Sequence, residues 1–201
     1  MTGRELQVAA LQRLEDLQHD LVHGDFQQGT TLSAQPDEAA VQNWLADRLR
    51  QVQGASYSIE REVRVANEKE PDLRFRAKAS DANVATEIKV AESWTMKELE
   101  DALIKQLCGQ YLRGKDAREG ILLLVHQKPR AKGWEMPDGT FLNFGAVVEQ
   151  LRALAARIRS ESIAGPQPEL CVVDVSSCAH LVERRKSVRK RSQRASKYTS
   201  A

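Results

Sequence analysis

The sequence predicts an α/β fold in which helices flank a mixed central sheet. Two segments with apolar residues at helical spacing come before a group of three short strand-like segments. A further helical segment then leads to 121–125, a continuous apolar run typical of a strand that is covered on both faces. The expected order of elements is therefore α-β-β-β-α-β.

The first two helices are expected at the N-terminal end of the chain. Thr2 to about Val22 has apolar residues at helical spacing, whereas His23 to Gln35 contains two glycines and several polar residues and predicts a connection. Pro36 opens the second helix, which should run to about Gln51. Its apolar positions form one stripe: Ala40, Val41, Trp44, Leu45 and Leu49.

The periodicity then changes and predicts three strands. The first spans Tyr57 to Val65 and is followed by the polar turn 67–70. The other two, Asp72 to Phe75 and Val84 to Val90, are joined by the polar loop 77–83. If this loop is symmetric, Asp72 lies opposite Glu87.

The C-terminal half continues with alternating elements. A helix is expected from about Thr95 to Arg113, with Gln106 on its core-facing stripe. After the apolar strand, a helix from Phe144 to Arg159 and a strand from Leu170 to Val175 form an added α-β layer.

Length and composition indicate one hydrophobic core. The chain has 201 residues, of which 41% are hydrophobic and 29% charged, enough to bury one core of ordinary size. We divide it into an N-terminal helix and linker (1–35), a main domain (36–182) and a tail (183–201). The apolar run 121–125 is too short to span a bilayer, and no signal segment is recognisable, so we expect a cytoplasmic protein. Three cysteines without CxxC spacing favour reduced thiols.

The charge of the chain is uneven. Residues 183–201 carry eight Lys or Arg and one acid, a net charge of +7, so that residues 1–182 carry −5 of the total of +2. Such a segment is too charged to bury and is expected to be a disordered basic arm. It is either a solvated terminus, a nuclear-localisation signal, or an arm that contacts phosphates through residues such as Arg185 and Lys190.

The main functional clue is the pairing of Pro71-Asp72 with Glu87-Ile88-Lys89. In a strand, Glu87 and Lys89 project to one face while Ile88 faces the other. Two opposed carboxylates destabilise a sheet unless a cation lies between them. Hard oxygen ligands with room for water suit Mg²⁺ or Mn²⁺, which points to a phosphate ester as substrate. A solvated ion pair at a strand edge is the alternative.

These residues resemble the signature of the PD-(D/E)XK nuclease superfamily. The resemblance covers roughly 36–127 and implies a restriction-endonuclease-like fold, whose common core has the order of elements given above. It also implies that Asp72, Glu87 and the main-chain carbonyl of Ile88 hold the metal, and that Lys89 assists hydrolysis.

Two further side chains are candidates for the same site. Glu38 matches an acid that several branches of the superfamily supply from the helix before the sheet, although an acid at a helix N-terminus is also stabilised by the helix dipole. Gln106 must find hydrogen-bond partners if it faces the sheet, either as a core amide or by orienting water or a metal ligand. Some branches have Gln-x-x-x-Tyr here, whereas Tyr111 follows Gln106 by five residues.

Lys128, Arg130 and Lys132, in the segment that ends at Trp134, form the favoured DNA-contact element, because a loop beyond the sheet combines cations with an aromatic residue. Trp94 and Trp134 could stack on bases, or anchor packing and a loop.

The sequence therefore predicts a Mg²⁺- or Mn²⁺-dependent nuclease acting on nucleic acid, with DNA favoured by the resemblance. A place in bacterial defence or repair, a homodimer, and association with a larger ATPase or sensor protein are further expectations from fold analogy. The alternatives are a catalytically inactive nucleic-acid-binding module and a protein-interaction domain with the same fold.

Overall fold

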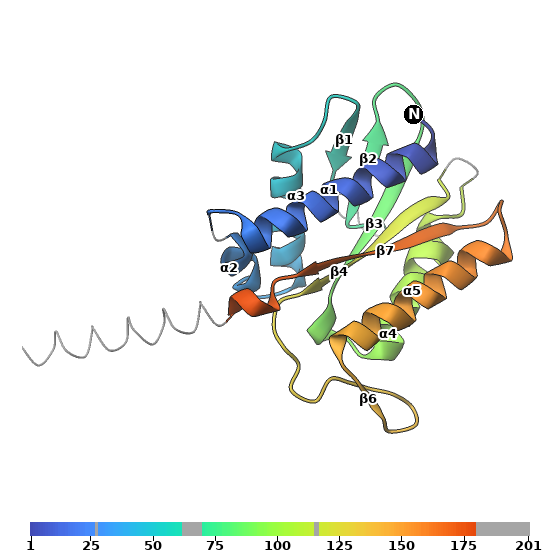
Figure 1. Cartoon of the computed structure of the whole chain (residues 1–201). Coiled ribbons are helices and arrows are strands. Elements are labelled where there is room, and N and C mark those ends of the chain that lie inside the picture. Colours follow the sequence, from blue (N-terminus) through green and yellow to red (C-terminus); the bar gives the residue numbers. More distant parts are fainter. Residues whose placement is uncertain (27, 62–69, 115–116, 180–201) are drawn as a thin grey trace, which may run out of the picture.

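The computed structural model describes residues 1–26, 28–61, 70–114 and 117–179. They form an α/β fold around a mixed five-stranded sheet with the strand order β1-β2-β3-β4-β7 (Figure 1). The pairs β1-β2 and β2-β3 are antiparallel, whereas β3-β4 and β4-β7 are parallel. The strands are β1 (Tyr57–Glu60), β2 (Leu73–Ala77), β3 (Asn83–Val90), β4 (Glu119–His126) and β7 (Gln167–Asp174).

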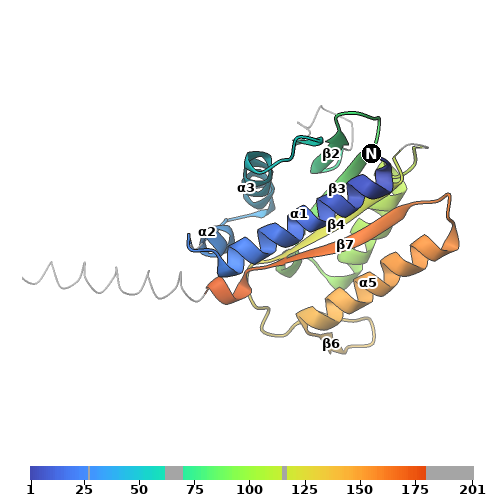
Figure 2. The same ribbon diagram turned by 45° about the horizontal axis from the view of Figure 1, so that its top comes forward.

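Helices cover both faces of this sheet. One face packs against α1 (Gly3–His23) and α3 (Glu38–Gln51) (Figures 1 and 2). The other packs against α4 (Met96–Asp101), the π-helix η2 (Ala102–Tyr111) and α5 (Phe144–Glu161). The predicted order α-β-β-β-α-β followed by α-β is observed as α3, β1, β2, β3, α4 with η2, β4, α5 and β7.

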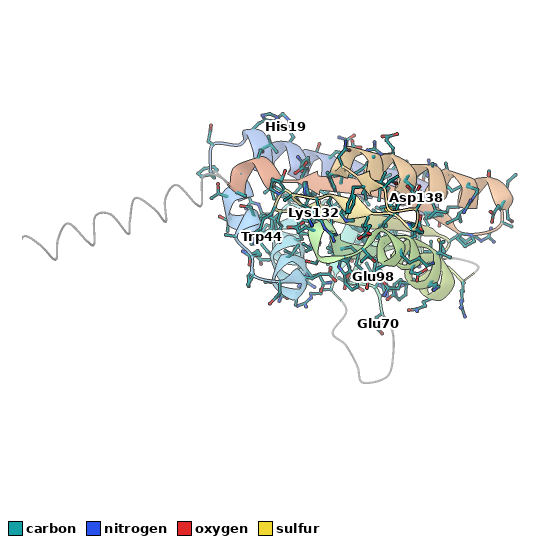
Figure 3. All side chains as sticks on the ribbon, turned by 90° about the horizontal axis from the view of Figure 1, so that it is seen from below. His19, Trp44, Glu70, Glu98, Lys132 and Asp138 are labelled. Carbon is teal, nitrogen blue, oxygen red and sulfur yellow. The ribbon has the colours of Figure 1, made fainter. Side chains whose placement is uncertain are left out.

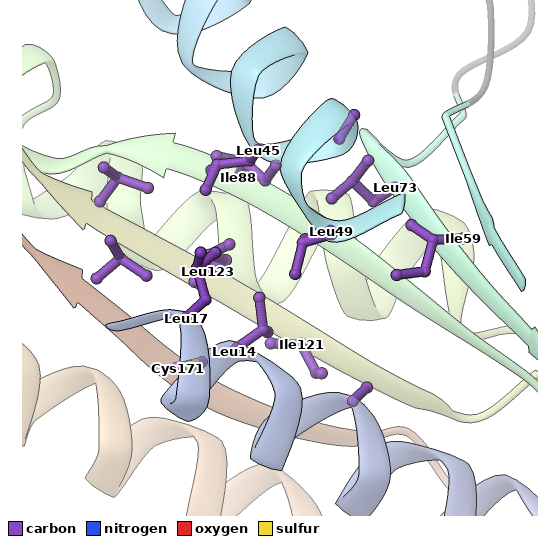
Figure 4. Close-up of a cluster of buried hydrophobic side chains, with 14 of the residues drawn as sticks. Leu14, Leu17, Leu45, Leu49, Ile59, Leu73, Ile88, Ile121, Leu123 and Cys171 are labelled. Atoms are coloured by element: carbon purple, nitrogen blue, oxygen red, sulfur yellow. The ribbon is translucent and has the colours of Figure 1, made fainter. Parts of the chain in front are cut away.

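The strands β3 and β4 are the centre of the core. Both are buried along most of their length, and their side chains alternate between the two faces. Ile88, Ile121 and Leu123 point toward α1 and α3 (Figure 4), whereas Leu122 and Leu124 point toward the opposite layer. This explains why the run 121–125 has no polar residue.

The first helix belongs to the same core as the sheet. A capping box formed by Thr2 and Glu5 starts α1, and its apolar stripe packs on the strands. The buried amide of Gln7 donates from Nε2 to the carbonyl oxygens of Gly120 (3.0 Å) and Gln167 (2.7 Å). The segment 1–35 therefore covers one face of the sheet.

Several predicted boundaries differ from the structure. The segment 23–35, predicted as a connection, contains α2 (Gln28–Ser33), because burial of Leu32 against the core outweighs a composition typical of loops. The single helix predicted over 95–113 is α4, started by a Thr95–Glu98 capping box, followed by the π-helix η2. Over so few turns, apolar spacing does not distinguish the two helix types.

The remaining expectations differ at element ends or fall outside the described residues. The last helix continues to Glu161 rather than Arg159, and β7 begins at Gln167 rather than Leu170. The first predicted strand is confirmed over Tyr57–Glu60, whereas its continuation through Val63 and Val65 and the turn at 67–69 lie outside the described residues. The basic tail 183–201 lies outside them too.

Between β4 and α5 the chain forms a loop and a small hairpin of β5 (Trp134–Glu135) and β6 (Phe141–Leu142). This segment projects at the bottom of Figure 1, and Figure 3, drawn from below, labels Lys132 and Asp138 at this end. Gly133 has φ +71°, and a Cβ atom there would lie 2.2 Å from the carbonyl oxygen of Leu142. Only glycine fits this close approach of the loop to the hairpin.

No helix in the described part of the chain has the length and apolar character needed to cross a membrane.

Candidate active site

The candidate site is built at a strand edge that β2 leaves open. The pairing of β2 with β3 begins at Leu73 and Thr86, so that the later residues of β3 extend beyond it. Beyond the end of β2, two carboxylates accept the hydrogen bonds of β3 that a paired strand would otherwise accept. Asp72 Oδ2 accepts from the backbone N–H of Ile88 (2.7 Å), and Glu38 Oε2 accepts from that of Val90 (2.9 Å). Each acid thereby satisfies a main-chain donor that would otherwise be unpaired.

Continuing this register places Asp72 opposite Glu87, as a symmetric loop predicts. Glu87 and Lys89 share one face of β3, and both are almost completely buried. Lys89 Nζ lies 2.8 Å from Glu87 Oε1 and 3.4 Å from Glu38 Oε1. The structure thus brings Glu38, Asp72, Glu87 and Lys89 together from α3, the start of β2, and β3.

The electrostatics of this cluster are unusual. Burial, with the nearby charge of Glu87 as the second cause, raises the pKa of Asp72 from 3.8 to about 7. Burial alone would lower the pKa of the Lys89 ammonium, but Glu87 and Glu38 outweigh it, and the pKa of Lys89 is raised above its ordinary value. Lys89 is therefore a cation at neutral pH, while Asp72 can exchange its proton.

Trp94 also belongs to this site, although the sequence did not place it there. Its indole Nε1 donates to Glu38 Oε2 (2.7 Å), and Lys89 Nζ lies 4.8 Å from the centre of its ring. A cation over an indole face is attracted by the ring electrons. Trp94 therefore contacts both the acid and the ammonium, whereas the sequence suggested base stacking or loop packing. Nothing in the neighbouring residues Glu87-Ile88-Lys89 predicts that Trp94 contacts Glu38.

Gln106 lies beside Lys89 in a cavity. The cavity has a volume of about 260 Å³, and its lining includes Lys89, Trp94, Gln106 and Gln110. Within the described part of the chain, the buried Oε1 atom of Gln106 has no hydrogen-bond partner. Gln106 thus lines a cavity beside the ammonium, and its buried carbonyl oxygen keeps its capacity to accept a hydrogen bond.

The donor set fits a small hard cation with few protein ligands. No group of three or more His, Cys, Asp or Glu side chains within the described ranges is arranged to hold a metal ion. Mg²⁺, however, commonly takes one or two carboxylates and completes its shell with water and phosphate oxygens. Asp72 and Glu87 supply two carboxylates whose mutual repulsion a cation would relieve. Since Ile88 N–H points to the open edge, its own carbonyl points there as well.

The predicted nucleic-acid-binding residues fall into two groups. Lys128, Arg130 and Lys132 are exposed in the loop after β4. Arg130 donates to the carbonyl oxygen of Trp94 (2.9 Å) and lies 5.4 Å from the ring centre of Trp134, which ties this loop to the site. Arg185 and Lys190 lie outside the described residues.

Comparison with models of protein families, with curated proteins and with solved structures gives no match. The functional assignment consequently depends on the geometry of the site and on the residue pattern of Asp72, Glu87 and Lys89.

Proposed function

We propose that this protein is a metal-dependent nuclease of the PD-(D/E)XK type, acting on nucleic acid, with DNA as the favoured substrate. The observation that supports the proposal most strongly is the placement of Asp72 opposite Glu87, two carboxylates in a buried setting that raises the pKa of Asp72 to about 7. Like charges are costly to bury together unless a cation or a proton lies between them. Mg²⁺ at phosphate-ester sites is commonly held by one or two carboxylates, which this pair can supply.

Asp72, Glu87 and the carbonyl of Ile88 are the proposed metal ligands. When bound, the ion polarises a phosphoryl oxygen and lowers the pKa of a bound water. Lys89 is a buried cation at neutral pH and stabilises negative charge that develops on the phosphate. Gln106, which lines the cavity beside Lys89, accepts a hydrogen bond from an attacking water through its carbonyl oxygen and orients that water.

Glu38 and Trp94 are positioning residues in this proposal. Glu38 accepts from Val90 N–H, from Trp94 Nε1 and from Lys89 Nζ. Its carboxylate therefore holds the open edge of β3 and the ammonium in one arrangement. A role in defence or repair, and association with a second copy or with a larger ATPase or sensor protein, are proposed from the family resemblance alone.

A catalytically inactive binding module is the second candidate, and one observation favours it. Lys89 is paired with both Glu87 and Glu38, so the cluster already contains a cation supplied by the protein. In that case Lys89 offsets one of the carboxylate charges and a proton on Asp72 offsets another, so that the four side chains form a network that stabilises the strand edge.

The deciding experiment is cleavage of supercoiled, linear and single-stranded DNA and of RNA with Mg²⁺, Mn²⁺ or EDTA. We expect metal-dependent cutting that Asp72→Asn, Glu87→Gln and Lys89→Met each reduce at least about a hundredfold, since one such interaction contributes 10²- to 10³-fold to a rate. Asp81→Asn and Lys78→Met, at exposed positions in the loop between β2 and β3, are the matched controls.

The outcomes separate the two candidates. Cutting that survives all three substitutions excludes this site as the catalytic one. Binding of nucleic acid without cutting under any metal condition moves the inactive module ahead of the nuclease.

A further inference from the structure

A second cavity lies beside the loop that follows β4. Its volume is about 340 Å³, and its lining includes His126, Arg130, Lys132, Phe141, Asn143 and Phe144. We name it the hairpin groove, because the loop 129–133 forms one wall and β6 with the start of α5 forms the other. Neither Glu38, Asp72, Glu87 nor Lys89 lines it.

The floor of the hairpin groove contains a buried histidine with an unused ring nitrogen. His126 is 5% exposed, and its Nδ1 lies 3.2 Å from Asp174 Oδ1. Burial would raise the pKa of Asp174, but the hydrogen bonds from His126 and Ser176 together outweigh it and lower this pKa, so the carboxylate is ionised and can only accept. Nδ1 therefore carries the proton. Within the described ranges, the buried Nε2 atom has no hydrogen-bond partner.

The walls of the groove combine phenyl rings, from Phe141 and Phe144, with positively charged side chains. Phe141 is 53% exposed, which is high for a large apolar side chain on a short strand. Phe144 stacks on His126 with ring centres 4.0 Å apart. The described residues that line the groove include the cations of Arg130 and Lys132 and no carboxylate. Flat apolar rings beside cations are the features that bind a base and its phosphate.

The groove is held in shape and is connected to the candidate active site. Gly133 brings the loop directly against Leu142, a contact that a larger residue would prevent. The Asn143 side chain caps α5 by accepting from the N–H of Ala146 (2.9 Å). Arg130 donates to the carbonyl oxygen of Trp94, and Trp94 donates to Glu38. The groove and the proposed site of hydrolysis are therefore joined through Arg130 and Trp94.

We propose that the hairpin groove binds one unpaired nucleotide of the nucleic-acid substrate. The base stacks on Phe141, the phosphate lies against Lys132 and Arg130, and His126 Nε2 accepts a hydrogen bond from the bound unit or from a water beneath it. The proposal rests on the proposed function and deepens it: the substrate is one with a single-stranded segment next to the cut.

The test measures binding without cleavage. Fluorescence anisotropy with a labelled single-stranded DNA of ten nucleotides, in EDTA, is recorded for the native chain, Phe141→Ala and Lys132→Ala. We expect Phe141→Ala to weaken binding about fivefold to tenfold, since a base stacked on an aromatic ring contributes at this scale. Phe26→Ala and Arg152→Ala remove an exposed phenyl and an exposed cation elsewhere, and should leave binding unchanged.

Comparing the binding of different nucleic acids identifies which species the groove binds. A blunt duplex should bind more weakly than the single strand, and free nucleoside monophosphate should compete only at much higher concentration. If Phe141→Ala, Lys132→Ala and the native chain bind the single strand with equal affinity, the groove is not the binding site. If the native chain binds blunt duplex as tightly as the single strand, the bound nucleotide does not have to be unpaired. Competition by monophosphate at the concentration of the strand shows a free-nucleotide site instead. Because metal is absent, each result is independent of whether the protein cuts.

Discussion

Asp72 extends the register of β2 so that its carboxylate lies opposite Glu87, while its Oδ2 atom accepts from the backbone N–H of Ile88 at 2.7 Å. One carboxylate therefore has two opposing roles. It satisfies a main-chain donor at the open edge of β3, and it places a negative charge beside another in the interior. Burial first, and the charge of Glu87 second, raise the pKa of Asp72.

We expect the contribution of Asp72 to the stability of the protein to fall as pH rises from about 4 to about 7. Asp72 has a pKa of 3.8 in an ordinary setting and about 7 in the folded chain, so the folded state holds an extra proton in this window. The shift corresponds to at most about 4 kcal/mol, since each pKa unit is worth ~1.36 kcal/mol. Urea unfolding between pH 4 and pH 8 measures it.

The matched substitution for this effect is Asp72→Asn. The amide oxygen can still accept from Ile88 N–H, but it carries no charge beside Glu87, so the pH dependence should flatten and stability at pH 8 should rise. Asp81→Asn, at an exposed position, should keep the native profile. An unchanged slope in Asp72→Asn would show that Asp72 does not titrate in this window.

Addition of Mg²⁺ or Mn²⁺ should stabilise the native chain at pH 8. A cation between Asp72 and Glu87 binds only the folded state, and at ten times its Kd it raises the free energy of unfolding by about 1.4 kcal/mol. A thermal-shift titration measures this rise. Glu87→Gln should abolish it, whereas Glu149→Gln, on the exposed face of α5, should retain it. Equal shifts in the two variants would place the cation elsewhere.

Lys89→Met should destabilise the fold by about 3 kcal/mol, because removing one partner of a buried ion pair leaves its carboxylates uncompensated. Lys97→Met removes an exposed lysine paired with Asp101 and should cost less than ~1 kcal/mol. Denaturant unfolding at pH 8 compares the two. Combining Lys89→Met with Glu87→Gln should recover part of the loss, and strict additivity would contradict the pairing.

Thr86→Val should stabilise the protein by about 1 kcal/mol. Thr86 is fully buried in β3, and its Oγ1 atom has no hydrogen-bond partner within the described residues. Valine has nearly the same shape and removes the cost of burying an unpaired hydroxyl. Thr86→Ser, which keeps the hydroxyl and removes the methyl group, should instead destabilise. A lower unfolding midpoint for Thr86→Val would indicate that the hydroxyl is satisfied.

The order of elements and the cluster of Asp72, Glu87 and Lys89 follow from local sequence. Period-two alternation places Glu87 and Lys89 on one face, and a polar loop of suitable length brings Asp72 opposite Glu87. A place for Glu38 in the site was expected only from the family resemblance, and its contact with Lys89, 51 positions away, was not predicted.

Other contacts depended on packing that the sequence does not encode locally. Trp94 reaches Glu38 because the chain turns sharply after β3, and the π-helix that presents Gln106 has the same apolar spacing as an α-helix. The helix at Gln28–Ser33 has a loop-like composition and forms because Leu32 is buried. In each case tertiary contacts outweigh the local preference of the residues.

The hydrogen bonds from Gln7 to Gly120 and Gln167 join residues 113 and 160 positions apart. During synthesis, α1 leaves the ribosome long before β7 exists, so its apolar stripe must wait for most of the chain to be made. Contacts of such high sequence separation slow the folding of a domain. The first helix is therefore expected to be among the last elements to dock, and its apolar stripe stays exposed to water until then.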